Sequence, residues 1–377
     1  MLEQIKNQIE EQFYAIFGSG FAPKICFAPG RVNLIGEHTD YNGGYVLPGA
    51  LSMGTYACGR NRRDEEVNFY SCNYPNEELW KNYPKAVITI MEEEFGRAKQ
   101  GMDLLFWGTI PTGSGLSSSA SLEVCCGYLI SKLWGIHLDK IQLAQLCRRA
   151  ENELIGVQCG IMDQFASAMG KKDYVIGLNT GNLQYEYATA ESQEYEFVIV
   201  NSMVKHSLAD SQYNERRKEC RKACEILSKY RSVSQLCELT VSEFEQYKSG
   251  IEDCIIQKRA EHVIYENERT KQGIAALNRK DFKQFGVLMN QSHDSLKELY
   301  QVSCEEIDFL VEEAGKMDGV LGSRITGGGF GGCTIHLIDK KIKSNFQENL
   351  KQLYLHQYNK KIECYSVQFE DGVHCLQ

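Results

Sequence analysis

Four ionisable side chains are gathered in one short segment, residues 28–44, whose glycines mark it as a loop. They are Arg31, Glu37, His38 and Asp40. Carboxylates accept hydrogen bonds from hydroxyl groups with well-defined geometry, so this combination suits a ligand that carries many hydroxyls. A surface loop held by salt bridges is the alternative interpretation.

A second segment, residues 110–120, combines glycines with serines between a predicted strand and a predicted helix. Backbone N–H groups and the positive end of the helix dipole would point at the occupant of such a loop, which favours an anion. Gly113 and Gly115 let the backbone approach closely, and the serines at positions 117–119 offer oxygens to phosphate or Mg²⁺. A serine-rich helix cap that binds nothing is the alternative.

The familiar nucleotide-binding patterns are excluded. Residues 110–120 lack the Gly-Lys-Ser/Thr ending of a Walker P-loop, and the chain contains neither His-Arg-Asp nor Asp-Phe-Gly, the protein-kinase signatures. Gly327, Gly329 and Gly332 have dinucleotide-binding spacing, but the β-branched residues 333–338 predict a strand where that site needs a helix. We therefore reject an oxidoreductase and interpret this loop as backbone that passes close to a ligand, or as a tight hairpin turn.

Residues 28–44 closely resemble the galactokinase signature of the GHMP small-molecule kinases. Residues 111–120 resemble the phosphate loop of that family, and residues 327–332 resemble its third, C-terminal motif. Residues 159–164, 201–208 and 292–304 also look like galactokinase segments, so the resemblance covers most of the chain. Three dispersed motifs in the expected order are far more specific than any one of them.

The resemblance implies an α+β chain with the GHMP kinase fold. Residues 1–178 would form an N-terminal domain like ribosomal protein S5, residues 179–377 a ferredoxin-like α+β domain, and the active site would lie between them. The implied activity is transfer of the γ-phosphate of ATP to the anomeric hydroxyl of galactose, with Mg²⁺. The products are galactose 1-phosphate and ADP.

Carried over position by position, the resemblance makes Asp163 the catalytic carboxylate and Arg31 its cationic neighbour. A helix N-terminus and a nearby Arg31 would favour the ionised form of Asp163, which either takes the hydroxyl proton or mainly orients the hydroxyl. The resemblance implies sugar contacts at Glu37, His38, Asp40, Gly160 and Tyr213, and Mg²⁺ ligands at Ser119 and Glu151. It implies an adenine pocket with the aromatic residues Trp80 and Tyr83, which could equally be core residues. The implied phosphate loop consists of Gly113, Ser114, Gly115, Leu116, Ser117, Ser118, Ser119 and Ala120.

Two departures from the family pattern concern local ion pairing and sugar specificity. Residues 178–181 stand where an Asp-Cys-Arg-like stretch is expected, and Lys205 stands where arginine is usual. Another GHMP sugar 1-kinase, N-acetylgalactosamine kinase first among them, and a catalytically silent galactose sensor are kept as alternatives. The uninterrupted phosphate loop argues against the sensor.

Composition is that of a soluble globular protein, with 43% hydrophobic and 24% charged residues and a net charge of -9. That charge opposes an RNA-binding module and makes nucleic acid an unexpected partner. No apolar run is long enough to span a membrane, so we expect a cytoplasmic protein, and a monomer. The basic cluster Arg60, Arg62 and Arg63 is interpreted as solvated surface. The fifteen cysteines are interpreted as reduced and mostly buried, with Cys220 and Cys224 open to metal binding or oxidation.

Local sequence patterns predict part of the secondary structure that must position these residues. Strands are predicted within residues 24–50 and at 67–70, 103–107, 174–178 and 197–201, and a strand, glycine loop and strand over 320–338. Helices are predicted from 117 to 134 with a stop at Gly135, from Asp139 to about residue 154 with a capping box to Gln142, and over 161–169. Long helical patterns occupy 210–316. The domain boundary is placed near residue 178.

Overall fold

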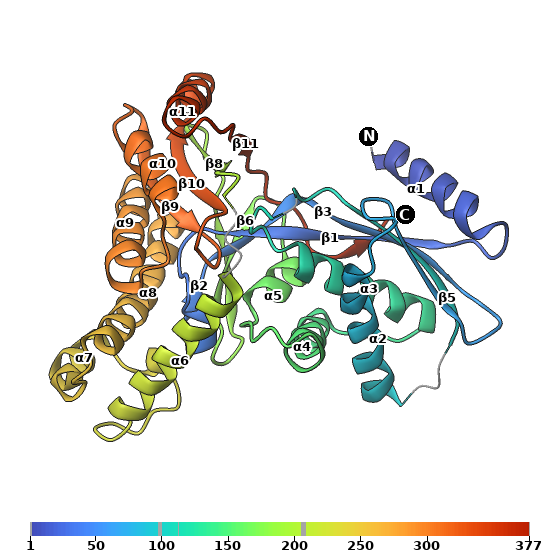
Figure 1. Ribbon diagram of the computed structural model, residues 1–377, viewed down its shortest axis with the longest axis horizontal. Helices are drawn as coiled ribbons and strands as arrows, with labels where there is room; N and C mark the ends of the chain where they lie inside the picture. The colour runs from blue at the N-terminus through green and yellow to red at the C-terminus, as the bar shows by residue number, and fades with distance from the viewer. Residues whose placement is uncertain (1, 97–99, 112, 205–208, 377) are drawn as a thin grey trace.

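The computed structural model describes residues 2–96, 100–111, 113–204 and 209–376, and the side chains of all of these except residues 2, 209 and 210. Its strands and helices form an elongated molecule with one sheet towards each end (Figure 1). A small third sheet lies between the two. The predicted α+β class is confirmed.

The first sheet has the strand order β12-β1-β3-β5-β4. Successive side chains of a strand point to opposite faces, and β1 shows this clearly. Cys26 and Ala28 face one hydrophobic core, whereas Ile25 and Phe27 face another. The strands of this sheet are β1 (Lys24–Asn33), β3 (Pro48–Asn61), β4 (Val67–Ser71), β5 (Met102–Gly108) and β12 (His374–Cys375).

Helices cover both faces of this sheet. Ile9 and Phe13 of α1 (Leu2–Phe17) pack on the face that carries Ile25 and Phe27. Four helices cover the other face (Figure 1). They are α2 (Asn82–Phe95), α3 (Ser118–Trp134), α4 (Lys140–Ala150) and α5 (Met162–Met169).

The second sheet has the order β11-β8-β10-β9, and the small sheet has the order β2-β6-β7. Their strands are β8 (Tyr195–Asn201), β9 (Val320–Thr326), β10 (Cys333–Asp339) and β11 (Glu363–Ser366), and β2 (Tyr45–Val46), β6 (Tyr174–Asn179) and β7 (Tyr185–Thr189). The helices of this half are α6 (Ala209–Leu227), α7 (Val241–Tyr247), α8 (Cys254–Asn278), α9 (Phe282–Ser295), α10 (Glu305–Gly315) and α11 (Lys343–Tyr358).

The predicted strands and helices are present, and two of the sequence-based predictions are corrected. Gly135 ends α3 in a left-handed conformation with φ 69°. Asp139 caps α4 by accepting from the N–H groups of Ile141 and Gln142. That helix ends at Ala150, however, and a π-helical turn (Glu151–Ile155) continues it, so the single predicted helix is composite.

The basic cluster is the second correction. Arg60 is buried rather than solvated, and its Nε donates to Asp103 Oδ2 at 3.0 Å. Arg62 donates to the other oxygen of Asp103, also at 3.0 Å. Arg60 and Arg62 therefore share one buried carboxylate on the neighbouring strand β5, whereas Arg63 is exposed as predicted.

The chain crosses between the two halves more than once. After β11 the chain leaves the second half, and its last strand, β12, pairs antiparallel with β1 (Figure 1). β6, which ends beside the predicted boundary, pairs with β2 on one side and β7 on the other. The division at residue 178 stays a proposal. Among the described residues no helix is long and apolar enough to cross a membrane.

Candidate active site

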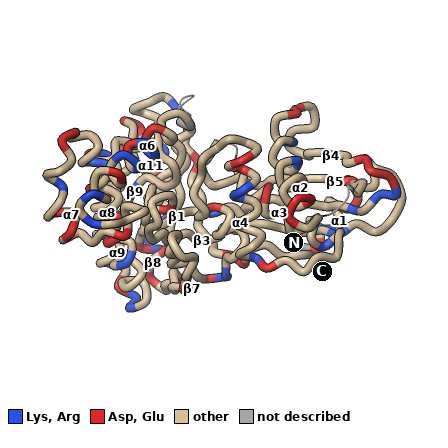
Figure 2. Tube along the Cα trace, turned by 90° about the horizontal axis from the view of Figure 1, so that it is seen from below, with Lys and Arg blue, Asp and Glu red and all other residues tan. Residues whose placement is uncertain are grey.

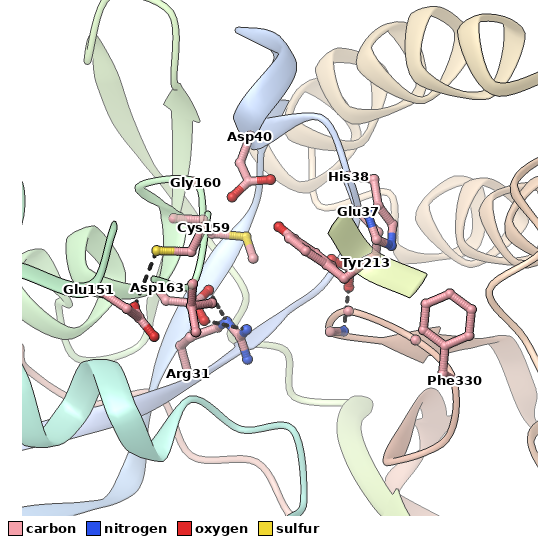
Figure 3. Close-up of a pocket in the computed structure, with 15 residues that line it drawn as sticks. Arg31, Glu37, His38, Asp40, Glu151, Cys159, Gly160, Asp163, Tyr213 and Phe330 are labelled. Carbon is pink, nitrogen blue, oxygen red and sulfur yellow. Dashed lines mark hydrogen bonds and ion pairs between the residues drawn. The ribbon is translucent and has the colours of Figure 1, made fainter. Parts of the chain in front are cut away.

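A cavity of about 200 Å³ lies where the two halves meet. It is bounded by the loop after β1, the start of α5, one face of α6 and the glycine loop between β9 and β10. The structure brings the predicted catalytic pair, all predicted sugar contacts and one predicted metal ligand to its wall (Figure 3). These residues are Arg31, Glu37, His38, Asp40, Glu151, Gly160, Asp163 and Tyr213.

Arg31 and Asp163 form a two-pronged ion pair (Figure 3). Arg31 Nε donates to Asp163 Oδ1, and Nη2 donates to Oδ2, both at 2.8 Å. The third Arg31 nitrogen donates to the carbonyl oxygen of Gly115 at 2.8 Å, which fixes the pair against the phosphate loop. Ser117 Oγ also donates to Asp163 Oδ2. Bidentate arginine–carboxylate geometry fixes orientation as well as charge.

A bulge in β1 makes this placement possible. The register against β3 shifts between Pro29 and Arg31, and a bulge of this kind re-aims the side chain that follows it. A Cβ atom on Gly30 would meet the carbonyl oxygen of Leu116 at 2.6 Å. The Arg31 N–H donates to that same carbonyl at 3.2 Å. Glycine therefore lets the phosphate loop lie directly on β1.

Glu37 is fully enclosed and held by groups from both halves. Asn33 Nδ2 donates to Oε2 at 2.8 Å, and the Gly327 N–H donates to Oε1 at 2.9 Å. Arg324 Nη1 lies 3.4 Å from the same Oε1. Burial raises the pKa of Glu37, while Arg324 and the Asn33 hydrogen bond act in the opposite direction.

Asp40 and Gly160 lie in contact on the opposite wall (Figure 3). A Cβ atom on residue 160 would overlap the Asp40 carboxylate, so only glycine leaves that carboxylate in place. Burial and repulsion from the Asp163 and Glu37 carboxylates raise the pKa of Asp40 to about 7. A hydrogen bond donated by a neutral hydroxyl group would therefore stabilise the ionised form of Asp40.

His38 and Tyr213 supply the aromatic part of the wall. His38 adopts a left-handed backbone with φ 63°, and its Nδ1 lies 2.8 Å from the Tyr41 hydroxyl. Its ring centroid is 5.5 Å from that of Tyr213, which α6 contributes. Burial lowers the pKa of His38 and raises that of the Tyr213 hydroxyl, so both are neutral at physiological pH.

The phosphate loop is a run of left-handed residues, Gly113, Gly115 and Ser117, with φ of 71°, 72° and 60°. Such a run turns successive N–H groups toward one side, which suits an anion. The Ser114 hydroxyl is committed to the Pro111 carbonyl at 2.8 Å, and the Ser114 carbonyl accepts from Cys333 Sγ at 2.9 Å. The loop is therefore braced from the second half of the molecule.

Glu151 and Ser119 are brought together beside this loop. A Ser119 hydrogen bond is among the interactions that lower the pKa of Glu151, which burial raises overall. Gln164 Nε2 and Cys159 Sγ both reach Glu151 Oε2, at 2.6 and 3.2 Å. A carboxylate and a hydroxyl are hard oxygen donors that fit Mg²⁺, which takes few protein ligands when phosphates supply the rest.

No cluster of three or more His, Cys, Asp or Glu side chains placed to hold a metal ion occurs in the described part of the chain. Cys220 Sγ instead lies 3.0 Å from the buried Tyr300 hydroxyl. A metal site at Cys220 and Cys224, left open by the sequence, thus gains no support from the fold.

Trp80 and Tyr83 line a separate cavity of about 200 Å³. Ser118 and Ser119 at the start of α3 line it too, so it adjoins the phosphate loop. Trp80 also packs edge-on against Phe106 at 5.8 Å. Trp80 therefore fits both interpretations, because it lines the cavity and also packs against a core residue.

Several residues that support the site were not predicted. Asn33 and Arg324 hold Glu37, and Gln164 holds Glu151. Asn33 and Gln164 lie inside the resembling segments, so a search for amide partners of the carboxylates would have found them. Arg324 carries no sequence signal, because only the pairing of β9 with β10 brings it under the loop.

The two departures from the family pattern have different outcomes. Thr180 donates through both its N–H and its hydroxyl to the carbonyl of Gly44, at 3.0 and 2.9 Å. Residues 178–181 thus brace the signature loop by hydrogen bonds rather than by an ion pair. Lys205 lies outside the described residues, as does Thr112 of the phosphate loop.

Three family models match this chain: the galactokinase galactose-binding signature over residues 11–61, the GHMP kinase N-terminal domain over 82–171, and the GHMP kinase C-terminal domain over 274–356. The galactokinase of Clostridium acetobutylicum is 43% identical, with 98% of each chain covered. That of Enterococcus faecalis is 44% identical over 99% of this chain and 100% of the relative. The chain belongs to the galactokinase family.

The crystal structure of Lactococcus lactis galactokinase complexed with galactose superposes with a TM-score of 0.95, at 38% identity, covering 99% of this chain and 100% of that one. As a galactokinase-family member, the protein has the predicted GHMP kinase fold and belongs to the predicted kinase class. Its charges agree with a small-molecule enzyme: Figure 2 shows acidic and basic residues interleaved along the described trace, without a continuous basic stripe.

Proposed function

We propose that the protein transfers the γ-phosphoryl group of ATP to the anomeric hydroxyl of galactose, giving galactose 1-phosphate and ADP. One observation carries the proposal most directly. Arg31 binds Asp163 with two nitrogens and the phosphate loop with the third, so the pair stands between the polar cavity and the loop. A sugar in the cavity would meet the transferred group at this pair.

The cavity wall suits a hexose. Asp40 and Glu37 offer carboxylate oxygens, and His38 and Tyr213 offer neutral polar edges on aromatic rings. Ligand sites of this kind combine apolar walls with a few convergent polar groups that fix orientation. Asp40 would receive hydroxyl hydrogens, which compensate for the repulsion it experiences from Asp163 and Glu37.

Asp163 would accept a hydrogen bond from the anomeric hydroxyl and either take its proton or hold it in line for attack. The Ser117 hydroxyl and Arg31 hold both carboxylate oxygens, which restrains the carboxylate in one orientation. Arg31 also places a permanent positive charge beside the phosphate loop. Charge of that kind stabilises the phosphoryl oxygens during transfer.

Ser119 and Glu151 would hold Mg²⁺, which when bound neutralises charge on the β- and γ-phosphates. The N–H groups of residues 113–120 would bind the phosphates themselves. The cavity beside Trp80 and Tyr83 would take the adenine ring. We also propose that the protein acts as a monomer.

The test is ADP release from ATP and Mg²⁺ across a panel of free sugars that includes galactose, glucose and N-acetylgalactosamine. Galactose should be turned over best. Faster turnover of N-acetylgalactosamine would replace the proposed substrate, and galactose binding without ADP release would indicate a sensor.

Replacement of the proposed catalytic carboxylate separates binding from turnover. Asp163→Asn should still bind galactose in calorimetry, because the amide keeps the shape of the side chain. Its turnover should fall roughly 10²-fold or more, the range for lost acid–base function. Turnover within threefold of the parent would remove Asp163 from the role.

A further inference from the structure

Two cysteines that are 349 residues apart in sequence meet on neighbouring strands, and neither lines the active-site cavity. Cys26 of β1 and Cys375 of β12 are directly opposed partners, and their sulfur atoms are 3.1 Å apart. The Leu376 N–H donates to the Ile25 carbonyl, which makes the cysteines a non-hydrogen-bonded pair of the antiparallel ladder. Side chains at such pairs point to the same face and approach closely.

We propose that Cys26 and Cys375 are an oxidation site at which a hydroperoxide links the two thiols and ties β12 covalently to β1. This inference is independent of the proposed kinase function. It rests on the opposed register and on the sulfur separation. Closing a disulfide from this position needs a movement of about 1 Å, since bonded sulfurs lie about 2.05 Å apart.

The two thiols differ in a way that assigns their roles. Cys375 is half-buried, whereas Cys26 is fully buried behind it, so an oxidant reaches Cys375 first. Once Cys375 is ionised, the Cys26 thiol can donate to it, and the ammonium groups of Lys132 and Lys24 attract the negative charge; together they hold the pKa of Cys375 below its usual range. The thiolate is the form that reacts.

The step balances as a two-electron oxidation. The Cys375 thiolate attacks one oxygen of hydrogen peroxide, an S–O bond forms, the O–O bond breaks, and hydroxide leaves and takes up a proton as water. The Cys26 sulfur then attacks the sulfenic sulfur of Cys375. An S–S bond forms, the S–O bond breaks, and the departing hydroxide leaves as a second water with the Cys26 proton.

The disulfide would reinforce the junction between β1, β12 and α5, the helix that contains Asp163. The segment before β12 lies against α5: the Gly372 N–H donates to the Gly170 carbonyl at 2.7 Å, and the Val373 N–H donates to the Ser167 carbonyl at 2.9 Å. Ser167 Oγ donates in turn to the Pro29 carbonyl of β1 at 2.7 Å. A crosslink between β1 and β12 would restrain this layer and raise thermal stability.

The experiment treats the reduced full-length protein with hydrogen peroxide, alkylates the remaining thiols under denaturing conditions, and maps peptides by mass spectrometry. We expect a peptide pair joined at Cys26 and Cys375, reversed by dithiothreitol, and a thermal midpoint a few degrees higher in the oxidised protein. Cys375→Ser should lose both effects. Cys254→Ser, which removes the exposed cysteine, should keep both.

Cys26→Ser provides a second variant, and because residue 26 is buried its folding is checked by circular dichroism first. If Cys26 and Cys375 stay reduced while Cys254 is oxidised, the proposal is overturned. A crosslink from Cys26 to Cys125, the other thiol beside it, would overturn it as well. So would an equal shift of the thermal midpoint in Cys375→Ser and the parent protein.

Discussion

Asp40 shares the cavity with two other carboxylates, Asp163 and Glu37. Burial and repulsion from Asp163 and Glu37 raise its pKa to about 7, so in the free protein it is largely protonated below neutral pH. A sugar hydroxyl that donates to Asp40 stabilises the ionised form. Sugar binding and proton release at this residue are therefore coupled.

The coupling predicts that galactose affinity rises with pH. Between about pH 5.5 and 7.5 the affinity should increase roughly tenfold, because less free energy is spent on removing the proton as the solution approaches the free-protein pKa. Calorimetry across this range measures the effect. Asp40→Asn should bind more weakly and lose most of the slope; an unchanged slope in the variant would assign it to another group.

The same shift has a consequence for stability with the opposite sign. The folded-state pKa of Asp40 lies above its ordinary value of 3.8, so between about pH 4 and 7 the folded protein holds a proton that the unfolded chain has released. Its contribution to the free energy of unfolding therefore falls as pH rises through this window. In the absence of sugar, Asp40→Asn should lose less stability than the parent over the same pH range.

Gly160 has a steric role that can be tested separately. A methyl group at residue 160 would occupy the place of the Asp40 carboxylate, so Gly160→Ala should displace Asp40 and raise the KM for galactose roughly tenfold or more, with little change in the KM for ATP. Gly315→Ala is a matched control, since a Cβ there meets open space. Equal KM values for galactose in both variants would contradict this role.

At the scale of elements, the sequence predicted what local patterns control. Gly135 and Asp139 set the boundary between α3 and α4 by φ preference and by capping, and both effects act within a few residues. The helix α2 is not predicted, because no side chain caps its N-terminus. In α1, Ile5, Ile9 and Phe13 recur every fourth residue, a helical spacing that could have been recognised.

The site residues that could be predicted are those that lie close together in the sequence. Residues of the signature loop and of 159–164 lie within short motifs, so their grouping was visible. The bracing of Glu37 by Arg324 depends on a contact between residues 287 apart and on the register of β9. Such long-range pairings leave no periodic trace in one sequence, and the π-helical turn that presents Glu151 leaves none either.

The short 3₁₀ turn Leu79–Lys81 and the start of α2 carry the aromatic wall of the second cavity. Trp80→Leu should raise the KM for ATP roughly tenfold, because aromatic stacking area is lost, and should leave the KM for galactose unchanged. Trp134→Leu, at the other end of α3 in the same core, is the matched control for lost packing. If both variants change the KM for ATP alike, Trp80 acts through the core and not through the nucleotide.

On the scale of the whole molecule, the cavity exists only because the two halves are held in register. One contact that joins them beneath it is the buried pair of Glu37 and Arg324, with 2% and 0% side-chain exposure and 3.4 Å between the charged atoms. The Gly327 N–H and the Asn33 amide complete the environment of the carboxylate. Two charges taken out of water stabilise each other, so removal of one leaves the other with weaker compensation, from Arg31 for Glu37 and from Glu266 for Arg324.

This arrangement predicts a strong coupling between the two positions. Arg324→Met should lower the free energy of unfolding by about 3–5 kcal/mol, because it leaves the Glu37 carboxylate buried without its cation. Glu37→Gln should also destabilise, since Arg324 then lacks its partner. The double variant should lose less than the sum of the two single losses, by about 1.5 kcal/mol or more, because neither buried charge then remains. Chemical denaturation of all four proteins without sugar measures the cycle. Costs that add to within about 0.5 kcal/mol would show that the pair is not what holds the two halves together at the cavity.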